Sequence, residues 1–251
     1  MDLKDKTAFV TGGSGDIGSA IAKALAKVGA DVALSYVGHV EGAKATIKAV
    51  TETGRRGLAV QLDQRDSASI EASVDAVIKE FGKVDILVNN AGWNIGIPFP
   101  DLETLTSDIW DRVLETNLRG PYLLSRAFAK HLRERGTGRI VNIASVGGLS
   151  PGSSSIAYSS SKAGLIHLTR CLAVAMAPDV TVNCIAPGLV EGTRMAKRLP
   201  EAVAQGARNQ AVLGRVGDVE DIAQQTVMFC KSESITGQVL VVDGGMPGSM
   251  H

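Results

Sequence analysis

The chain carries no excess of charge of either sign. Among its 251 residues, 26 Lys and Arg balance 26 Asp and Glu, so the formal net charge is +0 at pH 7. Proteins that bind nucleic acid or an anionic membrane surface through their overall field carry a positive balance, so we expect neither partner. With 45% hydrophobic and 21% charged residues, the composition is that of a folded globular protein and not of a disordered one.

Cysteines, metal-binding patterns and apolar spans are also scarce. The 3 cysteines, Cys171, Cys184 and Cys230, cannot all pair and have no CxxC spacing, which indicates reduced core residues in a cytoplasmic protein. The 4 histidines show no HExxH motif or paired ligand spacing, so we expect no metal site. The longest uncharged run, 140–161, is rich in Ser and Gly, which argues against a membrane-spanning helix.

What the sequence does contain is a regular alternation of short apolar runs and amphipathic stretches. The apolar runs predict strands at 7–11, 32–36, 58–62, 84–88, 140–144, 181–185 and 239–242. The amphipathic stretches predict helices at 17–28, 41–53, 67–81, 106–135, 156–176 and 220–230. This order indicates an α/β fold with a parallel sheet and helices on both faces. No linker or repeat interrupts it, so we expect a single domain over 1–251; a TIM barrel is the alternative.

A glycine-rich turn lies between the first predicted strand and the first predicted helix. It reads Thr11-Gly12-Gly13-Ser14-Gly15-Asp16-Ile17-Gly18. A helix N-terminus offers free N–H groups to a pyrophosphate, and glycines let the backbone approach it closely. The turn therefore favours a Rossmann-type doubly wound sheet over the barrel and predicts a dinucleotide site. A plain tight turn between strand and helix is the alternative interpretation.

Further polar and glycine features follow later strands. Ser145 comes after the strand at 140–144, and Asn90 follows the strand at 84–88. Tyr158 and Lys162 are four residues apart, which puts them on one face of a helix. Because ligands of doubly wound sheets bind at the carboxyl ends of the strands, we expect these side chains to share one site.

These features together resemble the short-chain dehydrogenase/reductase family, and the likeness runs from Lys6 to Gly245. The family's glycine turn reads T-G-x-x-x-G-x-G, and its catalytic set is Asn-Ser-Tyr-Lys. By this resemblance the catalytic residues are Asn117, Ser145, Tyr158 and Lys162.

The resemblance also implies a role for each catalytic residue. Tyr158 is the general acid and base, and Ser145 holds the substrate oxygen. Lys162 binds the nicotinamide ribose and lowers the pKa of Tyr158. An ammonium about 4 Å from the phenol, at an effective dielectric of about 20, gives an upper bound of roughly three pKa units. Asn117 kinks its helix and holds a water that links Lys162 to solvent.

The same resemblance implies a set of cofactor-binding residues. They are Gly12, Ser14, Asp16, Ile17, Gly18, Ser35, Asp63, Asn90, Ala91, Gly92, Tyr158, Lys162, Pro187, Gly188, Val190 and Thr193. The sequence departs from the family at Asp16, which stands where the middle glycine of the turn is expected. We expect its side chain to cap the helix that follows. Asp63 is expected to contact the adenine, and a structural turn acid is the alternative.

The end of the second strand bears on the choice of dinucleotide. NAD-specific proteins have an acidic residue there that holds the ribose 2′-OH, but this strand ends in Ser35, Tyr36 and Val37. A 2′-phosphate is therefore not repelled, and Ser35, the backbone near Val37 and His39 are candidates to bind it. No strong basic clamp is present, so we favour NADP(H) over NAD(H) with dual use possible.

The predicted function is an NAD(P)-dependent oxidoreductase that acts on a ketone or a secondary alcohol. A nucleotide-sensing protein without catalysis is the alternative, although such proteins usually lack the Tyr or the Lys. The resemblance implies a variable substrate lid at about 190–215 and a homotetramer, with a dimer as the alternative. The expected pocket residues are Trp93, Val146, Leu149 and Met195.

Overall fold

The computed structural model describes residues 1–249, which contain one sheet of seven parallel strands in the order β3-β2-β1-β4-β5-β6-β7. The strands are β1 (Thr7–Val10), β2 (Asp31–Tyr36), β3 (Gly57–Gln61), β4 (Ile86–Asn89), β5 (Gly138–Ile143), β6 (Val180–Pro187) and β7 (Val239–Val242). The strand order changes direction between β1 and β4, which in an open sheet creates a crevice at the carboxyl ends of the strands. The predicted doubly wound α/β fold is confirmed, and the open sheet excludes a TIM barrel.

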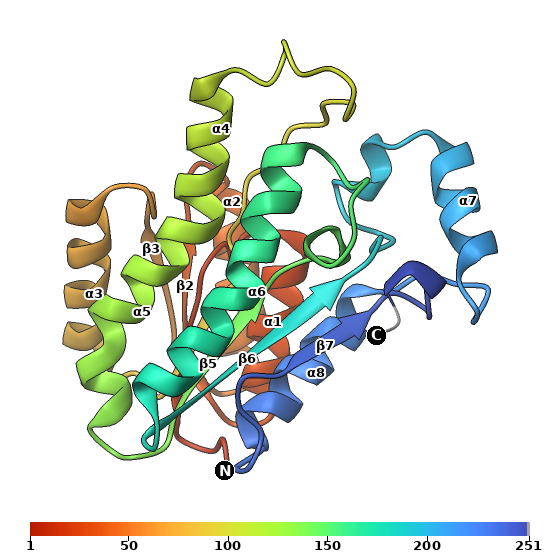
Figure 1. Cartoon of the computed structure of the whole chain (residues 1–251). Helices are drawn as coiled ribbons and strands as arrows, with labels where there is room; N and C mark the ends of the chain where they lie inside the picture. The colour runs from red at the N-terminus through yellow and green to blue at the C-terminus, as the bar shows by residue number, and fades with distance from the viewer. Residues whose placement is uncertain (250–251) are drawn as a thin grey trace.

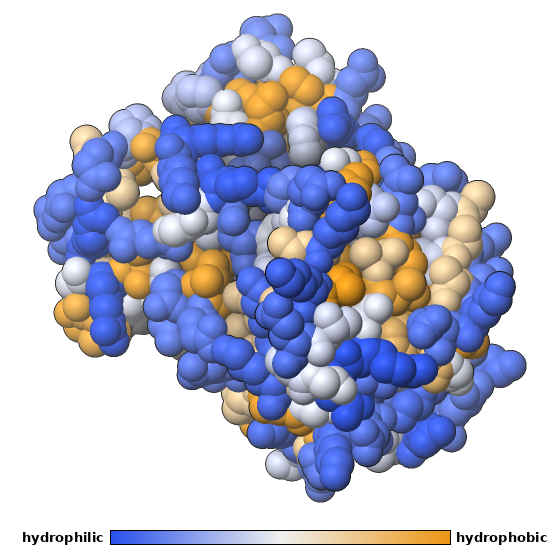
Figure 2. Space-filling view, turned by 180° about the vertical axis from the view of Figure 1, so that it is seen from behind, coloured by the Kyte–Doolittle hydropathy of each residue, from blue (hydrophilic) through white to orange (hydrophobic). Residues whose placement is uncertain are grey.

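Helices cover both faces of this sheet (Figure 1). One face carries α1 (Asp16–Lys27), α2 (Val40–Thr51) and α8 (Val219–Lys231). The other face carries α3 (Ser67–Phe81), α4 (Ser107–Leu114), α5 (Gly120–Arg133) and α6 (Ile156–Met176). Seen from behind, the surface is largely hydrophilic, and its hydrophobic residues gather in separate patches (Figure 2).

Alternate residues of each strand point into two hydrophobic cores. Ala8 and Val10 of β1 pack with α1 and α8, while Phe9 packs with α3 and α5. The ring centroids of Phe9 and Phe128 are 5.2 Å apart. Because both faces are buried, the strands are continuously apolar, and this is why they could be predicted as short apolar runs.

Two features differ from the regular pattern of helices. The long helix predicted at 106–135 is interrupted by a π-helical turn, Glu115–Arg119, which contains Asn117. In addition, the lid contains a helix that was not predicted, α7 (Glu201–Gln210), which stands apart from the sheet in Figure 1.

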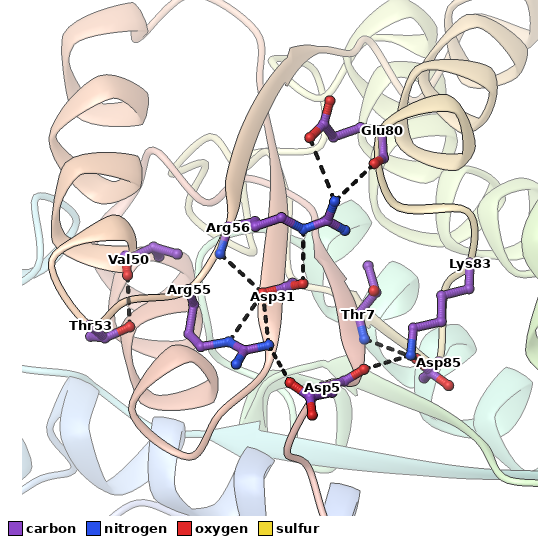
Figure 3. A network of polar contacts seen from close by, with 10 residues as sticks. All are labelled: Asp5, Thr7, Asp31, Val50, Thr53, Arg55, Arg56, Glu80, Lys83 and Asp85. Atoms are coloured by element: carbon purple, nitrogen blue, oxygen red, sulfur yellow. Dashed lines mark hydrogen bonds and ion pairs between the residues drawn. The ribbon is translucent and has the colours of Figure 1, made fainter.

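A network of ion pairs lies at the amino ends of the strands, opposite the crevice (Figure 3). Asp31 accepts hydrogen bonds from the Nε atoms of Arg55 and Arg56, each at 3.1 Å. Asp85 accepts one from the N–H of Thr7 and forms an ion pair with Lys83. Asp31 is the one acidic residue of β2. These contacts hold its carboxylate at the end of the strand that lies away from the crevice.

Candidate active site

The glycine turn forms a cradle that side chains would fill. Gly12 has a φ of +65°, which favours glycine. A Cβ atom on Gly18 would lie 2.4 Å from the carbonyl oxygen of Gly12, and one on Gly12 would lie 3.0 Å from the Cα of Ala91. The Asn90 amide donates to the carbonyl of Thr11 at 2.8 Å and holds the turn against the end of β4. The N-terminus of α1 thus faces a compact backbone turn, and this geometry fits the pyrophosphate of a dinucleotide.

Asp16 does not cap α1, so the expected capping role was wrong. The N-cap residue is Gly15, and no side chain bonds to the free N–H groups there. Asp16 is already helical, whereas a capping residue must be extended for its side chain to turn back to the helix. Its Oδ2 instead accepts the backbone N–H of Arg194 at 2.7 Å and lies 3.6 Å from the Arg194 Nε.

Ser35, expected to bind the 2′-phosphate, is buried beneath the glycine turn. Its side chain is only 2% exposed, and its Oγ accepts the N–H of Gly12 at 3.2 Å. It therefore supports the glycine turn from beneath, because a side chain in the middle of a sheet face points into the core. The exposed group brought to the turn is His39, whose Nδ1 lies 2.9 Å from the carbonyl oxygen of Ser14.

The carboxyl ends of β3 and β4 bring further residues to the crevice. The carboxylate of Asp63 is bound by Arg65, with an Oδ2 to Nη2 distance of 2.6 Å. This hydrogen bond is the main reason that the pKa of Asp63 lies below its usual value. Gln64 was not predicted as a site residue. It is buried and donates to the carbonyls of Ala91 and Thr116 at 3.1 and 2.6 Å. It joins the loop after β4 to the π-helical turn.

Tyr158, Lys162 and Ser145 are buried together, although they come from α6 and from the end of β5. Tyr158 is 9% exposed and Lys162 is 5% exposed. The Nζ of Lys162 donates to the carbonyl of Ile143 at 2.9 Å and lies 5.7 Å from the centroid of the Tyr158 ring. The Oγ of Ser145 accepts the N–H of Gly147 at 3.1 Å.

Burial controls the protonation of these groups. It raises the pKa of Tyr158 above its usual value, and a hydrogen bond with Ser145 only partly opposes this. Burial also lowers the pKa of Lys162 to about 8. The expectation that Lys162 lowers the pKa of Tyr158 is therefore wrong for this structure, because the ammonium is directed at Ile143 and desolvation of the phenolate dominates.

Asn117 uses its amide to fix the loop that carries Trp93. Its Oδ1 accepts the N–H of Trp93 at 2.8 Å, and its Nδ2 donates to the carbonyl of Trp93 at 2.9 Å and to the Oγ of Ser161 at 3.1 Å. A Cβ atom on Gly92 would lie 3.3 Å from the Asn117 Oδ1 and 3.6 Å from the Lys162 Nζ. The missing side chain of Gly92 thus leaves space between Asn117 and Lys162.

The expected substrate side of the site is built from three segments. Trp93 packs beside Tyr158 and Val113, and the Arg112 guanidinium lies 4.1 Å from its ring centroid. Asn94 donates to the Oγ of Ser154 at 3.2 Å and to the sulfur of Met195 at 3.8 Å.

Asn94 and Ser154 were not predicted, since single polar residues in loops carry no spacing signal. Ser154 has a φ of +62°, a strained conformation for a residue other than glycine. Val146 begins the short turn Val146–Gly148, and Leu149 packs against Leu165.

The remaining predicted cofactor residues lie where β6 leads into the lid. Pro187 ends β6, and a Cβ atom on Gly188 would lie 2.6 Å from the Cβ of Asp243. Val190 forms a β-bridge with Gly217. The hydroxyl of Thr193 donates to the carbonyl of Val190 and accepts the N–H of Ala196, so it stabilises the lid's own turn.

Within residues 1–249, no helix is long and apolar enough to cross a membrane. The same described part of the chain contains no group of three or more His, Cys, Asp or Glu side chains that could hold a metal ion.

Comparison with known proteins defines the family. The family model described as "Enoyl-(Acyl carrier protein) reductase" matches residues 13–247. The 3-oxoacyl-[acyl-carrier-protein] reductase FabG of Vibrio cholerae is 37% identical over 252 residues, which cover 98% of this chain and 99% of that protein.

Two solved structures are similar over almost the whole chain. One is a short chain dehydrogenase from Burkholderia cenocepacia in complex with NADP, with a TM-score of 0.89, 38% identity and coverage of 98% of this chain and 100% of that chain. The other is an NAD+-bound xylitol dehydrogenase, with a TM-score of 0.91, 30% identity and the same two coverages. The chain belongs to the short-chain dehydrogenase/reductase family, whose members are NAD(P)-using oxidoreductases.

Proposed function

We propose that this protein transfers a hydride between a nicotinamide dinucleotide and a ketone or secondary alcohol. The observation that carries the proposal is the joint burial of Tyr158, Ser145 and Lys162 beside the glycine cradle. A nucleotide-sensing protein is the alternative, but it has no use for a buried lysine without an acidic partner. Such a lysine costs stability, which favours a catalytic role.

The proposed mechanism assigns one task to each side chain. A bound nicotinamide supplies or accepts the hydride. In reduction, the Tyr158 hydroxyl donates its proton to the carbonyl oxygen of the substrate, and the raised pKa keeps that proton in place at neutral pH. Ser145 hydrogen-bonds the same oxygen and orients it. Lys162 binds the nicotinamide ribose through its ammonium, which is still largely protonated at neutral pH.

Asn117 is proposed to act by positioning. Its amide holds Trp93 and Gly92 in place, and the space beside Gly92 is the proposed position of a water that passes protons between Lys162 and solvent. The Asn117 side-chain amide already hydrogen-bonds to Trp93 and Ser161. The proposed water is therefore hydrogen-bonded to the neighbouring backbone of the π-helical turn.

We further propose that NADP(H) is preferred over NAD(H), with dual use possible. The support is that Asp31 is committed to Arg55 and Arg56 and that no acid ends β2 near the ribose. His39 lies at the glycine turn and is the group placed to meet a 2′-phosphate. The two similar structures, which bind NADP and NAD+ respectively, are compatible with either dinucleotide.

A fluorescence titration tests this without knowledge of the substrate. The purified protein is titrated separately with NADPH and NADH, and nicotinamide emission is followed. We expect both to bind or NADPH alone, with NADPH tighter. Tighter binding of NADH would overturn the proposed preference, and binding of neither would overturn the proposed function.

The proposed substrate is a medium-sized and partly apolar carbonyl compound. The proposed lining of its pocket is Trp93, Val146, Leu149 and Met195, and the proposed cover is the lid at about 190–215. Asn94 and Ser154 add polar groups where the loop after β4, the start of α6 and the lid meet.

We also propose that the protein is a cytoplasmic homotetramer, with a dimer as the alternative. Tyr122 of α5 and Val174 of α6 are exposed, and the surface of these two helices is one proposed interface. At another surface, β7 is an edge strand whose four apolar residues are all only partly buried. Exposed apolar edges are normally covered, and a second copy of this chain is the proposed partner at both surfaces. Free Cys171, Cys184 and Cys230 are consistent with a reducing compartment.

A further inference from the structure

One contact links the lid to the residue at which this chain departs from the family's glycine turn. Asp16 replaces the middle glycine of the turn, and Arg194 lies 178 positions further along, in the lid. The Asp16 carboxylate accepts the Arg194 backbone N–H at 2.7 Å and lies 3.6 Å from its guanidinium. Another guanidinium nitrogen, Nη2, lies 3.4 Å from the point where a Cβ on Gly15 would be. The Arg194 side chain therefore extends over the glycine turn itself.

The residues on both sides of Arg194 are anchored, so its position is defined. Thr193 is buried and bonds to Val190 and Ala196. Met195 accepts a hydrogen bond from Asn94 at its sulfur. Further along the lid, Arg208 forms ion pairs with both Glu191 and Glu201. These contacts fix the path of the lid across the opening of the turn.

The electrostatics of this arrangement are unusual for an anion site. A helix N-terminus attracts a pyrophosphate, but a carboxylate in the first helical position repels it. Asp16 is about one-third exposed, with a side-chain exposure of 34%, so its charge is only partly screened by water. A cation held beside it removes the repulsion and adds attraction for the phosphates.

We propose that Arg194 is the charge partner that makes the Asp16 turn able to bind an anionic dinucleotide. The lid thereby becomes part of the cofactor site, because the cation that the turn requires is carried by the lid. Arg194 bridges the carboxylate and the pyrophosphate, and Asp16 holds the lid by the Arg194 backbone. This proposal rests on the proposed function, since it assumes that a dinucleotide occupies the turn.

A double-mutant cycle with Asp16→Asn and Arg194→Gln tests the charge coupling. Asparagine keeps an oxygen for the Arg194 N–H and removes only the charge. The Kd for NADPH is measured by nicotinamide fluorescence at low salt. We expect Arg194→Gln to raise the Kd about tenfold, equivalent to about 1.4 kcal/mol, because Asp16 is left unpaired. Asp16→Asn with Arg194→Gln should return to within about threefold of the wild type.

The matched control is Arg198→Gln, another exposed arginine of the lid that has no ion pair within the described residues. Its Kd should equal that of the wild type. If the double variant binds as weakly as Arg194→Gln alone, or if Arg198→Gln weakens binding equally, the coupling to Asp16 does not exist and the proposal is overturned.

A second measurement needs no cofactor. Hydrogen exchange at the Arg194 amide of the free protein should be slow, faster in Asp16→Ala, and still slow in Asp16→Asn. Unprotected exchange in the wild type would show that the contact is absent and would overturn the proposal. Failure of the wild type to bind NADPH or NADH would instead overturn the proposed function, and the exchange result would separate the two cases.

Discussion

Tyr158 and Lys162 are both buried, and burial acts on their protonation in opposite directions. It raises the pKa of the phenol and lowers that of the ammonium to about 8, because in each case it disfavours the charged form. At neutral pH the tyrosine keeps its proton and the lysine is still largely charged. This is the combination that proton donation to a carbonyl oxygen requires.

Replacement of Lys162 by Met should stabilise the protein at neutral pH. The pKa of Lys162 is 10.5 in the unfolded chain and about 8 in the folded protein. Burial of the charged lysine therefore destabilises the wild type by its full amount below pH 8. As the pH rises from 8 to 10.5, the unfolded chain binds more protons than the folded one and the loss disappears. We expect Lys162→Met to be more stable at pH 7 by up to about 3 kcal/mol, and the difference to shrink at pH 9.5.

Urea unfolding of both proteins at pH 7 and pH 9.5 measures this difference. The ionisable groups that both proteins contain contribute equally to the two free energies of unfolding and cancel in the difference. A variant that is less stable than the wild type at both pH values would show that the hydrogen bond to Ile143 outweighs the burial of the charge.

For single residues, the sequence predicted which residues form the site better than it predicted where their side chains point. The spacing of Tyr158 and Lys162 could be recognised because a helix brings residues i and i+4 together. The environments of Asp16 and Ser35 could not be predicted in this way. They depend on the lid and on the face of the strand, which only the tertiary fold brings near. The predicted direction of the Tyr158 pKa shift was wrong for the same reason, because the spacing of residues does not show which of them are buried.

The π-helical turn Glu115–Arg119 connects α4 and α5 to the loop after β4. It directs Asn117 at Trp93, where two hydrogen bonds tie the backbone of the loop. This tie holds the loop after β4 at Trp93, and the Gln64 hydrogen bond to Ala91 holds it two residues earlier.

Asn117→Ala should destabilise the protein by about 2 kcal/mol, because the partly buried N–H and C=O groups of Trp93 lose their partner. Urea unfolding gives the change in free energy, and tryptophan emission, measured in a Trp110→Phe background, reports the environment of Trp93. As the control, Asn209→Ala on the exposed end of α7 should change neither. An unchanged emission spectrum and unchanged stability in Asn117→Ala would contradict the proposed positioning role.

The end of β2 should set the choice of dinucleotide. Tyr36 is the last residue of this strand, at the position where an acid holds the ribose 2′-OH in NAD-specific proteins. Tyr36→Asp should weaken NADPH binding at least tenfold and favour NADH, because a carboxylate repels the 2′-phosphate and accepts hydrogen bonds from the hydroxyls. Parallel titrations with the two cofactors check this, and an unchanged ratio of the two Kd values would place the ribose elsewhere.

Among the elements, all seven strands and six helical stretches were predicted, because their apolar residues face a core. Helix α7 was missed for a physical reason. Its sequence has few large apolar residues, and Ala204 is its one buried residue. A helix held by ion pairs to Arg208 gives no hydrophobic periodicity to detect.

In the whole molecule, the open sheet puts the proposed catalytic groups at the carboxyl ends of its strands and leaves apolar side chains exposed elsewhere. Val174 on α6 is 82% exposed, although a helix of a monomer normally turns such residues inward. This surface and the edge of β7 lie on different elements, so the proposed tetramer uses two separate surfaces.

Val174→Glu should therefore break one interface and leave the other. We expect the wild type to have the mass of a tetramer by light scattering coupled to size-exclusion chromatography, and the variant to have half that mass. The matched control is Val203→Glu on α7, which is also exposed and should remain tetrameric. A monomeric wild type would contradict the proposed assembly.

In the proposed mechanism, Tyr158 exchanges a proton with the substrate while the rest of the site holds the cofactor. The most direct test is Tyr158→Phe, assayed with NADPH and the carbonyl compound that the wild type reduces fastest in a panel. We expect turnover to fall by at least about 100-fold, with the Kd for NADPH changed by less than about threefold. Turnover close to that of the wild type would contradict the account.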